Sequence, residues 1–382
     1  MLLIKKASIY APEKLGTADL LLAGGRIIAM AQEIAAPEIP GVHVEHIEAE
    51  GMSLVPGFVD SLVHVTGGGG EDGFGGRTYP LQAEQALAAG VTTVIGCLGT
   101  DAVTRTHVDL LAAARALDSR GLSCFCLTGS YALPAVTLTG SIESDLVLIP
   151  EIIGLGEVAL ADHRGSQPLW HELARAASES RRGGMLAGKH GTVLLHLGDG
   201  EQPLNLLREV LERTELPKNQ FLPTHCNRGP SAFEDTLAYG IEGGKLDFTT
   251  STTESLLEEG EVPAARALAI ALEKGIDACS LSLSSDAQAS LPAFGADGEL
   301  TDTQVASIGS LWASARDAVT RYDVPFETAL ASVTSNPARN FGLHDRGRIE
   351  QGLRADLVLM NEEDFMPELV ISNGVIRWRR NS

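Results

Sequence analysis

Short apolar runs recur through the middle of the chain, and stretches with helical spacing of apolar positions separate several of them. The runs that predict strands lie at residues 54–60, 91–97, 122–128, 152–158, 192–197, 221–225, 246–250 and 279–286. Helical spacing occurs at residues 107–120, 203–214 and 304–320. Strands that alternate with helices are typical of a parallel sheet, and eight such units predict an α/β protein with a TIM-like (β/α)8 barrel.

The two ends of the chain have a different pattern, with short alternating runs separated by turns. They lie at residues 1–4, 19–30 and 43–49, and again at 356–360, 368–371 and 375–378. Alternation of this kind predicts β-structure with one buried face. We expect residues 1–56 and 345–382 to form one small β-sandwich domain, because the barrel, residues 57–344, begins and ends next to it.

Composition excludes some classes of protein. Hydrophobic residues make up 44% of the 382 residues, which is ordinary globular usage and too apolar for a mainly disordered chain. The chain carries 29 Lys and Arg against 50 Asp and Glu, a net charge of −21. So negative a protein lacks the basic face that nucleic acids and anionic lipid surfaces require.

Cysteine content and apolar run lengths predict a cytoplasmic protein. The first residues contain no long apolar run of a signal peptide, and no stretch reaches the ~18 apolar residues of a membrane span. The five cysteines are few and scattered, at positions 97, 124, 126, 226 and 279. We interpret them as reduced and mostly part of the core.

The candidate chemistry lies at the carboxyl ends of the predicted strands, where barrel enzymes place their functional side chains. Three of the ten histidines are there, His64, His196 and His225, together with Glu157 and Asp286. One such histidine would be better explained as a core residue. Three of them beside two carboxylates favour a site for Zn²⁺ or a similar divalent ion.

Several sequence blocks resemble a known family. VPGFVDSLVHV (55–65) resembles the PGFxDxHxH signature of the amidohydrolase superfamily, and TSNPARNFGL (334–343) with GRIEQGLRADLVLM (347–360) resembles its C-terminal run. GGGGED (67–72), LTGSYALPAVTLTGS (127–141), ADHRGSQP (161–168), LPTHCNR (222–228) and LSSDAQAS (283–290) resemble the isoaspartyl dipeptidases. The resemblance covers nearly the whole chain and implies a metal-dependent barrel with a small β-domain.

The resemblance implies cleavage of β-aspartyl dipeptides with zinc. It assigns the more exposed ion to His196 and His225, and the inner ion to His64 and Asp286. Asp286 would also act as general acid and base, and Tyr131 would donate to the developing oxyanion. A buried core phenol is the alternative for Tyr131.

The same resemblance implies a set of substrate contacts: Glu71, Thr100, Arg164, Arg228 and Ser290. Glu71 would bind the α-amino group, and Arg228 with Ser290 the α-carboxylate of the aspartyl residue. Arg164 would bind the carboxylate of the leaving residue. Surface salt bridges are the alternative for both arginines.

Two positions depart from the family pattern. Leu62 stands where the first histidine of HxH is expected, and Glu157 stands where the family has a carboxylated lysine. Leucine cannot bind a metal, whereas glutamate supplies a carboxylate on a shorter stem. Counting ligands predicts one zinc per chain, held by His196, His225 and Glu157, with the inner site weak or empty.

Three functions therefore stay open. The first is a metal-dependent amide hydrolase that acts on β-aspartyl dipeptides or a related small amide. The second is a catalytically silent homologue that binds a dicarboxylate or dipeptide. The third is another amidohydrolase reaction, such as cyclic-amide opening or deamination. In each case the partner is a small molecule, and the resemblance implies a homo-oligomer.

Overall fold

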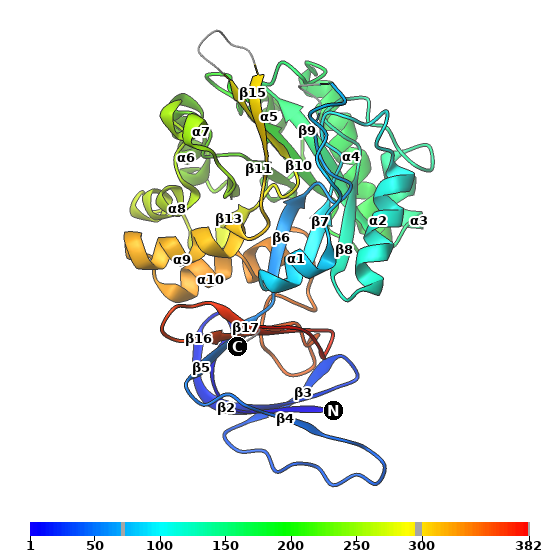
Figure 1. Ribbon diagram of the computed structural model, residues 1–382. Coiled ribbons are helices and arrows are strands. Elements are labelled where there is room, and N and C mark those ends of the chain that lie inside the picture. The colour runs from blue at the N-terminus through cyan, green and yellow to red at the C-terminus, as the bar shows by residue number, and fades with distance from the viewer. Residues whose placement is uncertain (70–72, 295–299, 381–382) are drawn as a thin grey trace.

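The computed structural model describes residues 1–69, 73–294 and 300–380. The chain forms a barrel-like α/β part and a β-sheet below it, to which both termini belong (Figure 1). This arrangement places the carboxyl ends of the barrel strands on the side away from the terminal sheet. The site residues follow those strand ends.

Six parallel strands form most of the barrel layer, in the order β11-β10-β9-β8-β7-β6. Their bounds are β6 Phe58–Val63, β7 Val91–Gly96, β8 Ser123–Thr128, β9 Ile152–Leu160, β10 Thr192–Leu197 and β11 Phe221–Thr224. A parallel pair, β12 (Leu246–Thr249) and β13 (Leu281–Ser284), continues the layer. Cys226 N–H donates to Asp247 O (3.1 Å) at one seam and His64 N–H to Ala287 O (2.9 Å) at the other, which gives the TIM-like arrangement.

Helices connect these strands and pack outside them (Figure 1). Their bounds are α1 Ala83–Ala88, α2 His107–Ser119, α3 Ile142–Leu148, α4 Trp170–Ala187, α5 Asn205–Arg213, α6 Pro230–Ile241, α7 Glu254–Glu258, α8 Ala264–Glu273, α9 Ser310–Tyr322, α10 Phe326–Ser332 and α11 Ser335–Asn340, with 3-10 turns η1 Lys218–Gln220 and η2 Ala278–Ser280. The helix predicted at 107–120 corresponds to α2, whose start is fixed by a hydrogen bond from Asp109 N–H to the Thr106 side chain.

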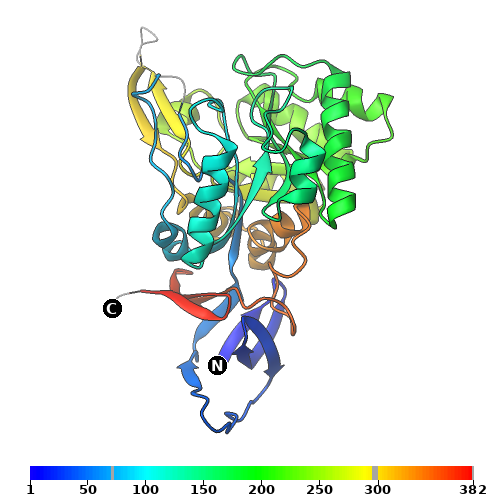
Figure 2. The same ribbon diagram turned by 90° about the vertical axis from the view of Figure 1, so that its right-hand side faces the viewer.

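One antiparallel hairpin was not expected from the sequence. It comprises β14 (Ser290–Phe294) and β15 (Leu300–Val305), and it projects at the end of the barrel opposite the terminal sheet (Figure 2). The helix predicted at 304–320 is therefore wrong at its start, because the chain is still in β15 at Val305 and α9 begins only at Ser310.

The first predicted strand, 54–60, is also corrected, because its apolar run belongs to two different sheets. β5 (Met52–Pro56) lies in the terminal sheet, and β6 begins the barrel at Phe58. Gly57 separates them and packs against the Thr92 side chain, which leaves no space for a Cβ atom. A continuous apolar pattern does not reveal such a change of sheet.

The terminal sheet has eight strands, in the order β18-β17-β16-β5-β1-β2-β3, with β4 also pairing with β1. Their bounds are β1 Leu2–Tyr10, β2 Lys14–Ala23, β3 Arg26–Ala31, β4 Glu45–Glu48, β16 Leu357–Asn361, β17 Pro367–Ser372 and β18 Val375–Arg379. Strands from both ends of the chain thus pair with each other. They belong to one sheet, so the described residues do not confirm a two-layer sandwich.

Alternation along β16 shows that the terminal sheet has an apolar core on each of its two faces. Leu357 and Leu359 face the apolar core of the terminal sheet, whereas Val358 and Met360 join the core beneath the barrel. Successive side chains of a strand point to opposite faces, so one short strand contributes to both cores.

A separate apolar layer fills the barrel interior. Its members include Val59, Leu62, Ile95, Cys97, Leu127, Leu194 and Leu222. The helices of the described residues include none that is both long and apolar enough to span a lipid bilayer.

Candidate active site

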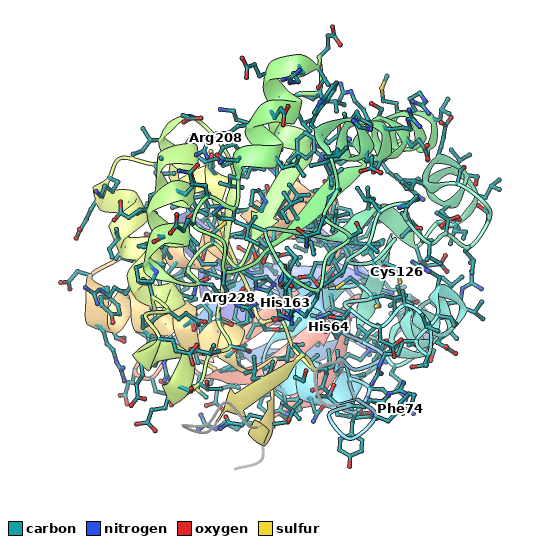
Figure 3. The ribbon with its side chains drawn as sticks, turned by 90° about the horizontal axis from the view of Figure 1, so that it is seen from above. His64, Phe74, Cys126, His163, Arg208 and Arg228 are labelled. Atoms are coloured by element: carbon teal, nitrogen blue, oxygen red, sulfur yellow. The ribbon has the colours of Figure 1, made fainter. Side chains whose placement is uncertain are left out.

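A cavity of about 520 Å³ opens at the carboxyl ends of the barrel strands. Five side chains predicted to act on substrate line it: Thr100, Tyr131, Arg164, Arg228 and Ser290. His64 and Asp286 also line it. Seen from above, His64, His163 and Arg228 lie near the middle, whereas Cys126, Phe74 and Arg208 lie toward the periphery (Figure 3). Glu71, the predicted amino-group contact, lies outside the described residues.

Glu157 is the centre of a buried cluster next to this cavity, which we call the histidine cluster: Glu157, His196 and His225. One carboxylate oxygen, Oε1, lies 2.7 Å from His196 Nδ1 and 3.0 Å from His225 Nε2. All three residues are at most 1% exposed. Strands β9, β10 and β11 are neighbours in the sheet, so their carboxyl ends bring these side chains together.

Each imidazole of the histidine cluster has a polar partner on its other nitrogen. His196 Nε2 lies 2.9 Å from Asp162 Oδ2, and His225 Nδ1 lies 2.6 Å from Thr249 Oγ1. Partners of this kind fix the orientation of metal-binding rings in proteins. The nitrogens that face Glu157 are therefore held in place.

The other side of Glu157 faces a second group, which we call the cysteine cluster: His64, Cys97 and Glu157. His64 Nε2 lies 3.8 Å from Glu157 Oε2 and 3.2 Å from Asp286 Oδ1. His64 is 5% exposed and lines the cavity, whereas His196 and His225 are 1% exposed.

Two of these residues have left-handed backbone conformations. His225 has φ of 60° directly after β11, and Asp286 has φ of 54° two residues after β13. Such values are uncommon for residues other than glycine and are frequent at functional sites. Here they turn both side chains at the strand ends.

Burial and neighbouring charges set the protonation of the clusters. Burial acts to raise the pKa of Glu157, but His196 and His225 hold it well below its usual range. Burial and the nearby Arg228 lower the pKa of His225 to about 3, so its ring is neutral. A carboxylate and a neutral imidazole are the forms in which these residues bind metal ions.

On the other side, burial lowers the pKa of His64, but Cys97 and Asp286 raise it well above its usual range. Burial raises the pKa of the Cys97 thiol to about 11.

Tyr131 and Arg164 border the histidine cluster. The Tyr131 hydroxyl lies 2.9 Å from His196 Nδ1, and the Arg164 guanidinium lies 5.4 Å from the Tyr131 ring centre. Burial and the charge of Glu157 raise the pKa of Tyr131 well above its usual value, which keeps the phenol protonated. Arg164 forms an ion pair with Asp162 (2.6 Å).

Arg228 lies on the side of the cysteine cluster. One of its terminal nitrogens is 3.5 Å from Asp286 Oδ2. Arg105 also lines the cavity, is 8% exposed, and donates to Gly68 O and Thr78 O, both at 3.0 Å. The cavity thus has three arginines on its wall in a strongly acidic protein.

The donor atoms of the histidine cluster fit a zinc ion in chemical type. Two imidazoles and a carboxylate are a common protein contribution to catalytic zinc, with bond lengths of about 2.0–2.2 Å. Donors of one tetrahedral ion then lie about 3.3 Å apart. The separations here are 2.7 and 3.0 Å, so the side chains would open by a few tenths of an ångström around an ion.

Four residues of the site were not assigned from the sequence: Cys97, Arg105, Asp162 and Thr249. Cys97 was interpreted as a core cysteine and Asp162 as part of a loop. Their position in the sequence could have revealed three of them. Cys97, Asp162 and Thr249 lie at or just after the carboxyl ends of β7, β9 and β12.

The model of the amidohydrolase family matches residues 224–377. A crystal structure of beta-aspartyl dipeptidase from Fervidobacterium islandicum AW-1, in complex with beta-Asp-Leu dipeptide, is 38% identical. That match covers 99% of this chain and 96% of the other, with a TM-score of 0.90. This chain belongs to the beta-aspartyl dipeptidase family of amidohydrolases.

The resemblance found in the sequence blocks is thus confirmed at the level of the family and of its barrel fold. A second structure of the Fervidobacterium dipeptidase is 37% identical over the whole chain, with a TM-score of 0.88. D-hydantoinase from Bacillus sp. AR9 shares the fold alone, at 16% identity and a TM-score of 0.68.

Curated relatives are more distant from this amidohydrolase. A dihydroorotase from Citrifermentans bemidjiense is 29% identical over 56% of this chain, and a urease subunit alpha from Sulfurisphaera tokodaii is 26% identical over 88%. The chain spans 47% and 60% of the length of these two relatives. Their activities do not transfer to it.

Proposed function

We propose that this protein is a metal-dependent hydrolase of β-aspartyl dipeptides. The observation that carries the proposal is the buried histidine cluster, placed directly beside a cavity whose wall holds Tyr131, Arg164 and Arg228. The Fervidobacterium dipeptidase that binds beta-Asp-Leu has the same fold over nearly the whole chain, which supports this substrate class.

Zinc is the metal we propose, held by His196, His225 and Glu157. When bound, it would polarise the amide carbonyl and lower the pKa of a coordinated water. Asp286 would carry the proton from water to the leaving amine. It is a buried carboxylate whose pKa is lowered by His64 although burial opposes this, so it starts ionised.

Tyr131 would donate a hydrogen bond from its hydroxyl to the oxygen on which negative charge develops. Its raised pKa keeps that proton available, and its contact with His196 holds it at the edge of the cluster. Arg228 and Ser290 would bind the aspartyl α-carboxylate, and Glu71 and Thr100 would contact the rest of that residue.

Arg164 would bind the carboxylate of the leaving residue. In the structure its guanidinium pairs with Asp162, so a substrate carboxylate would share it or displace Asp162. The arginines supply local attraction for a charged ligand, because the net charge of −21 repels anions at long range.

The assembly is proposed as well. We propose a cytoplasmic homo-oligomer that acts on a small-molecule substrate. Each chain would consist of the barrel, residues 57–344, and the terminal β-domain. These boundaries agree with the change of sheet at Gly57, between β5 and β6.

The test is release of aspartate from β-Asp-Leu, with α-Asp-Leu as the comparison substrate. We expect hydrolysis of the β-linked dipeptide alone, loss of activity with a chelator, and recovery with zinc. His225→Ala should abolish it, whereas His171→Ala, at an exposed position outside the cavity, should not.

Two results would replace this proposal. Thermal stabilisation by β-Asp-Leu without metal and without turnover would indicate a binding protein. Activity on a cyclic amide, with no response to β-aspartyl dipeptides, would indicate another amidohydrolase reaction.

A further inference from the structure

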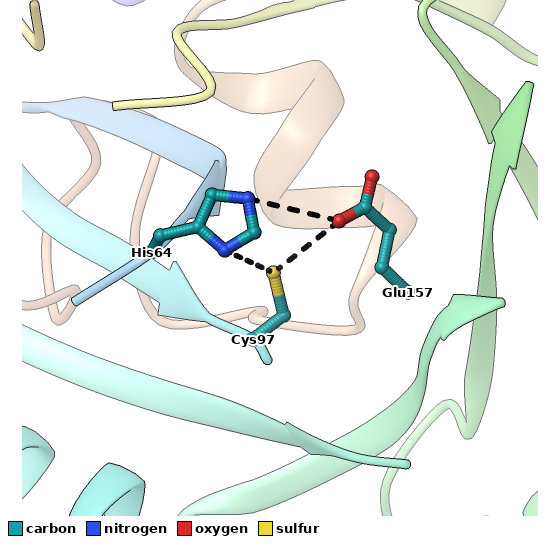
Figure 4. Close-up of side chains that lie close together, drawn as sticks. All are labelled: His64, Cys97 and Glu157. Carbon is teal, nitrogen blue, oxygen red and sulfur yellow. Dashed lines mark hydrogen bonds and ion pairs between the residues drawn. The ribbon is translucent and has the colours of Figure 1, made fainter. Parts of the chain in front are cut away.

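Cys97 lies at the carboxyl end of β7, pointing toward Glu157 from the side opposite the histidine pair. Its Sγ is 3.9 Å from His64 Nδ1 and 3.9 Å from Glu157 Oε2, and Figure 4 shows the three side chains converging. Cys97 is 1% exposed. A thiol, an imidazole and a carboxylate are therefore brought together in a buried space.

The surroundings of Leu62 show which family ligand is absent next to Cys97. Leu62 occupies the position of a histidine in the family signature, and its side chain is fully buried in the apolar layer of the barrel interior. Cys97 belongs to the edge of that same layer. The strand β6 has thus lost one metal donor, and the adjacent strand β7 presents another.

The separations are compatible with one ion. With Zn–N of about 2.0 Å and Zn–S of about 2.3 Å, donors of a tetrahedral site lie about 3.3–3.7 Å apart. In the cysteine cluster, one donor atom from each residue lies within 4.8 Å of the others, so the side chains would move inward by about 1 Å around an ion.

A fourth donor faces the same space. Asp286 Oδ1 is buried and forms an ion pair with His64 Nε2 at 3.2 Å.

We propose that Cys97, His64, Glu157 and Asp286 bind a second zinc ion, with the Cys97 thiolate taking the place of the imidazole that Leu62 lacks. The proposal rests on the proposed function, in which the histidine cluster binds the first ion through Glu157. Binding releases the thiol proton to solvent as the sulfur–zinc bond forms. Thiolate is a ligand that selects zinc over calcium or magnesium. The expected content changes from one ion per chain to two.

The experiment is cobalt substitution of the full-length protein. Thiolate bound to Co²⁺ gives a charge-transfer band in the near ultraviolet, and plasma mass spectrometry counts the ions. We expect two ions and the band in the wild-type protein and in Cys126→Ser and Cys279→Ser. We expect one ion and no band in Cys97→Ser.

Cys126 is the matched control because it is buried on the neighbouring strand β8 and contacts Leu110 O instead of the site. Cys279 controls for an exposed thiol. The band of the wild-type protein needs no variant at the site, so the proposal stays testable if Cys97→Ser does not fold. In Cys97→Ser with Leu62→His, the second ion should return without the band.

Several outcomes would overturn the proposal. The first is a wild-type protein that binds cobalt without the charge-transfer band. The second is a Cys97→Ser variant that keeps this band, and the third is a double variant that binds only one ion. Hydrolysis of β-Asp-Leu with one ion and no band would refute this inference alone. A protein that binds no ion and hydrolyses nothing would refute the proposed function as well.

Discussion

The two sides of Glu157 are built differently. In the histidine cluster the donors lie 2.7–3.0 Å apart, and each ring is held by a second polar partner. In the cysteine cluster one donor atom from each residue lies within 4.8 Å of the others, and Cys97 Sγ is 3.9 Å from both His64 Nδ1 and Glu157 Oε2. The histidine cluster is thus held by short polar contacts, whereas the cysteine cluster is more widely spaced.

If both clusters bind metal as proposed, the metal shell remains usable although one family ligand has changed. The side that kept its family ligands is held by its neighbours, Asp162 and Thr249. The side that lost a histidine, at Leu62, has a sulfur donor from the next strand. Ligands of both clusters converge on Glu157, so each side depends on the same carboxylate.

The largest effect is expected for Glu157→Gln, which removes the charge shared by both clusters. Loss of the metal's contribution of several kcal/mol to the transition state lowers kcat/KM on β-Asp-Leu by about 10³-fold or more. Bound zinc should fall in parallel. Glu259→Gln, at an exposed position on the same cavity, is the control. Near-normal activity in Glu157→Gln would show that neither cluster holds a catalytic ion.

Asp162→Asn tests the rigidity of the histidine cluster alone. The amide no longer holds the His196 ring as strongly, and zinc affinity should fall by about 10- to 100-fold. Competition with a chelator measures this affinity. Asp199→Asn changes a cavity residue that is exposed and should leave affinity unaltered. If Asp162→Asn and Asp199→Asn bind zinc equally well, the contact with Asp162 does not prepare the His196 ring for metal binding.

Arg228→Gln tests the cavity on the side of the cysteine cluster. A hydrogen bond to a charged group contributes about 1.5–3 kcal/mol, so KM for β-Asp-Leu should rise about tenfold or more. Zinc content should stay constant, which separates substrate binding from metal binding. Arg208→Gln is the control, because Arg208 pairs with Asp235 (2.6 Å) away from the cavity. An unchanged KM would remove Arg228 from the substrate site.

The smallest effect is expected for His190, which lies outside both clusters. It serves as a reference whose pH dependence should not respond to zinc. Burial and the positive charges of Lys245 and Arg181 lower the pKa of His190 to about 4. The unfolded chain, with a histidine pKa near 6.5, binds the proton first, so stability falls as pH falls from about 6.5 to about 4. Because His190 is only partly buried, solvent screening limits the effect to about 1 kcal/mol.

His190→Gln should remove this part of the pH dependence in urea unfolding, with or without zinc. A zinc-dependent change at His190 would mean that the residue is coupled to the clusters after all.

The sequence predicted the parts of this molecule that depend on local pattern. Helix α2 begins where the apolar spacing places it, and His64, His196 and His225 all lie near Glu157 because strand ends of a parallel barrel meet at one edge. The domain boundaries and the individual roles of the site residues stay predictions.

Other parts depend on contacts between distant segments. The apolar run through Gly57 looks like one strand, but its halves pair with different partners. Cys97 looks like any core cysteine, because its distance to Glu157 is set by the register of β7, β8 and β9. The hairpin β14–β15 follows the last barrel strand and has no counterpart in the regular alternation of the barrel.

The pairing of β5 with both β1 and β16 has a consequence for synthesis on the ribosome. β5 is made early, but its second neighbour is encoded near the end of the chain, at Leu357–Asn361. Until that segment emerges, one edge of β5 has no partner, and the apolar residues it shares with the C-terminal strands stay uncovered. Such edges pair readily with other chains. In the nascent protein this edge is therefore open to pairing with other chains until β16 has been translated.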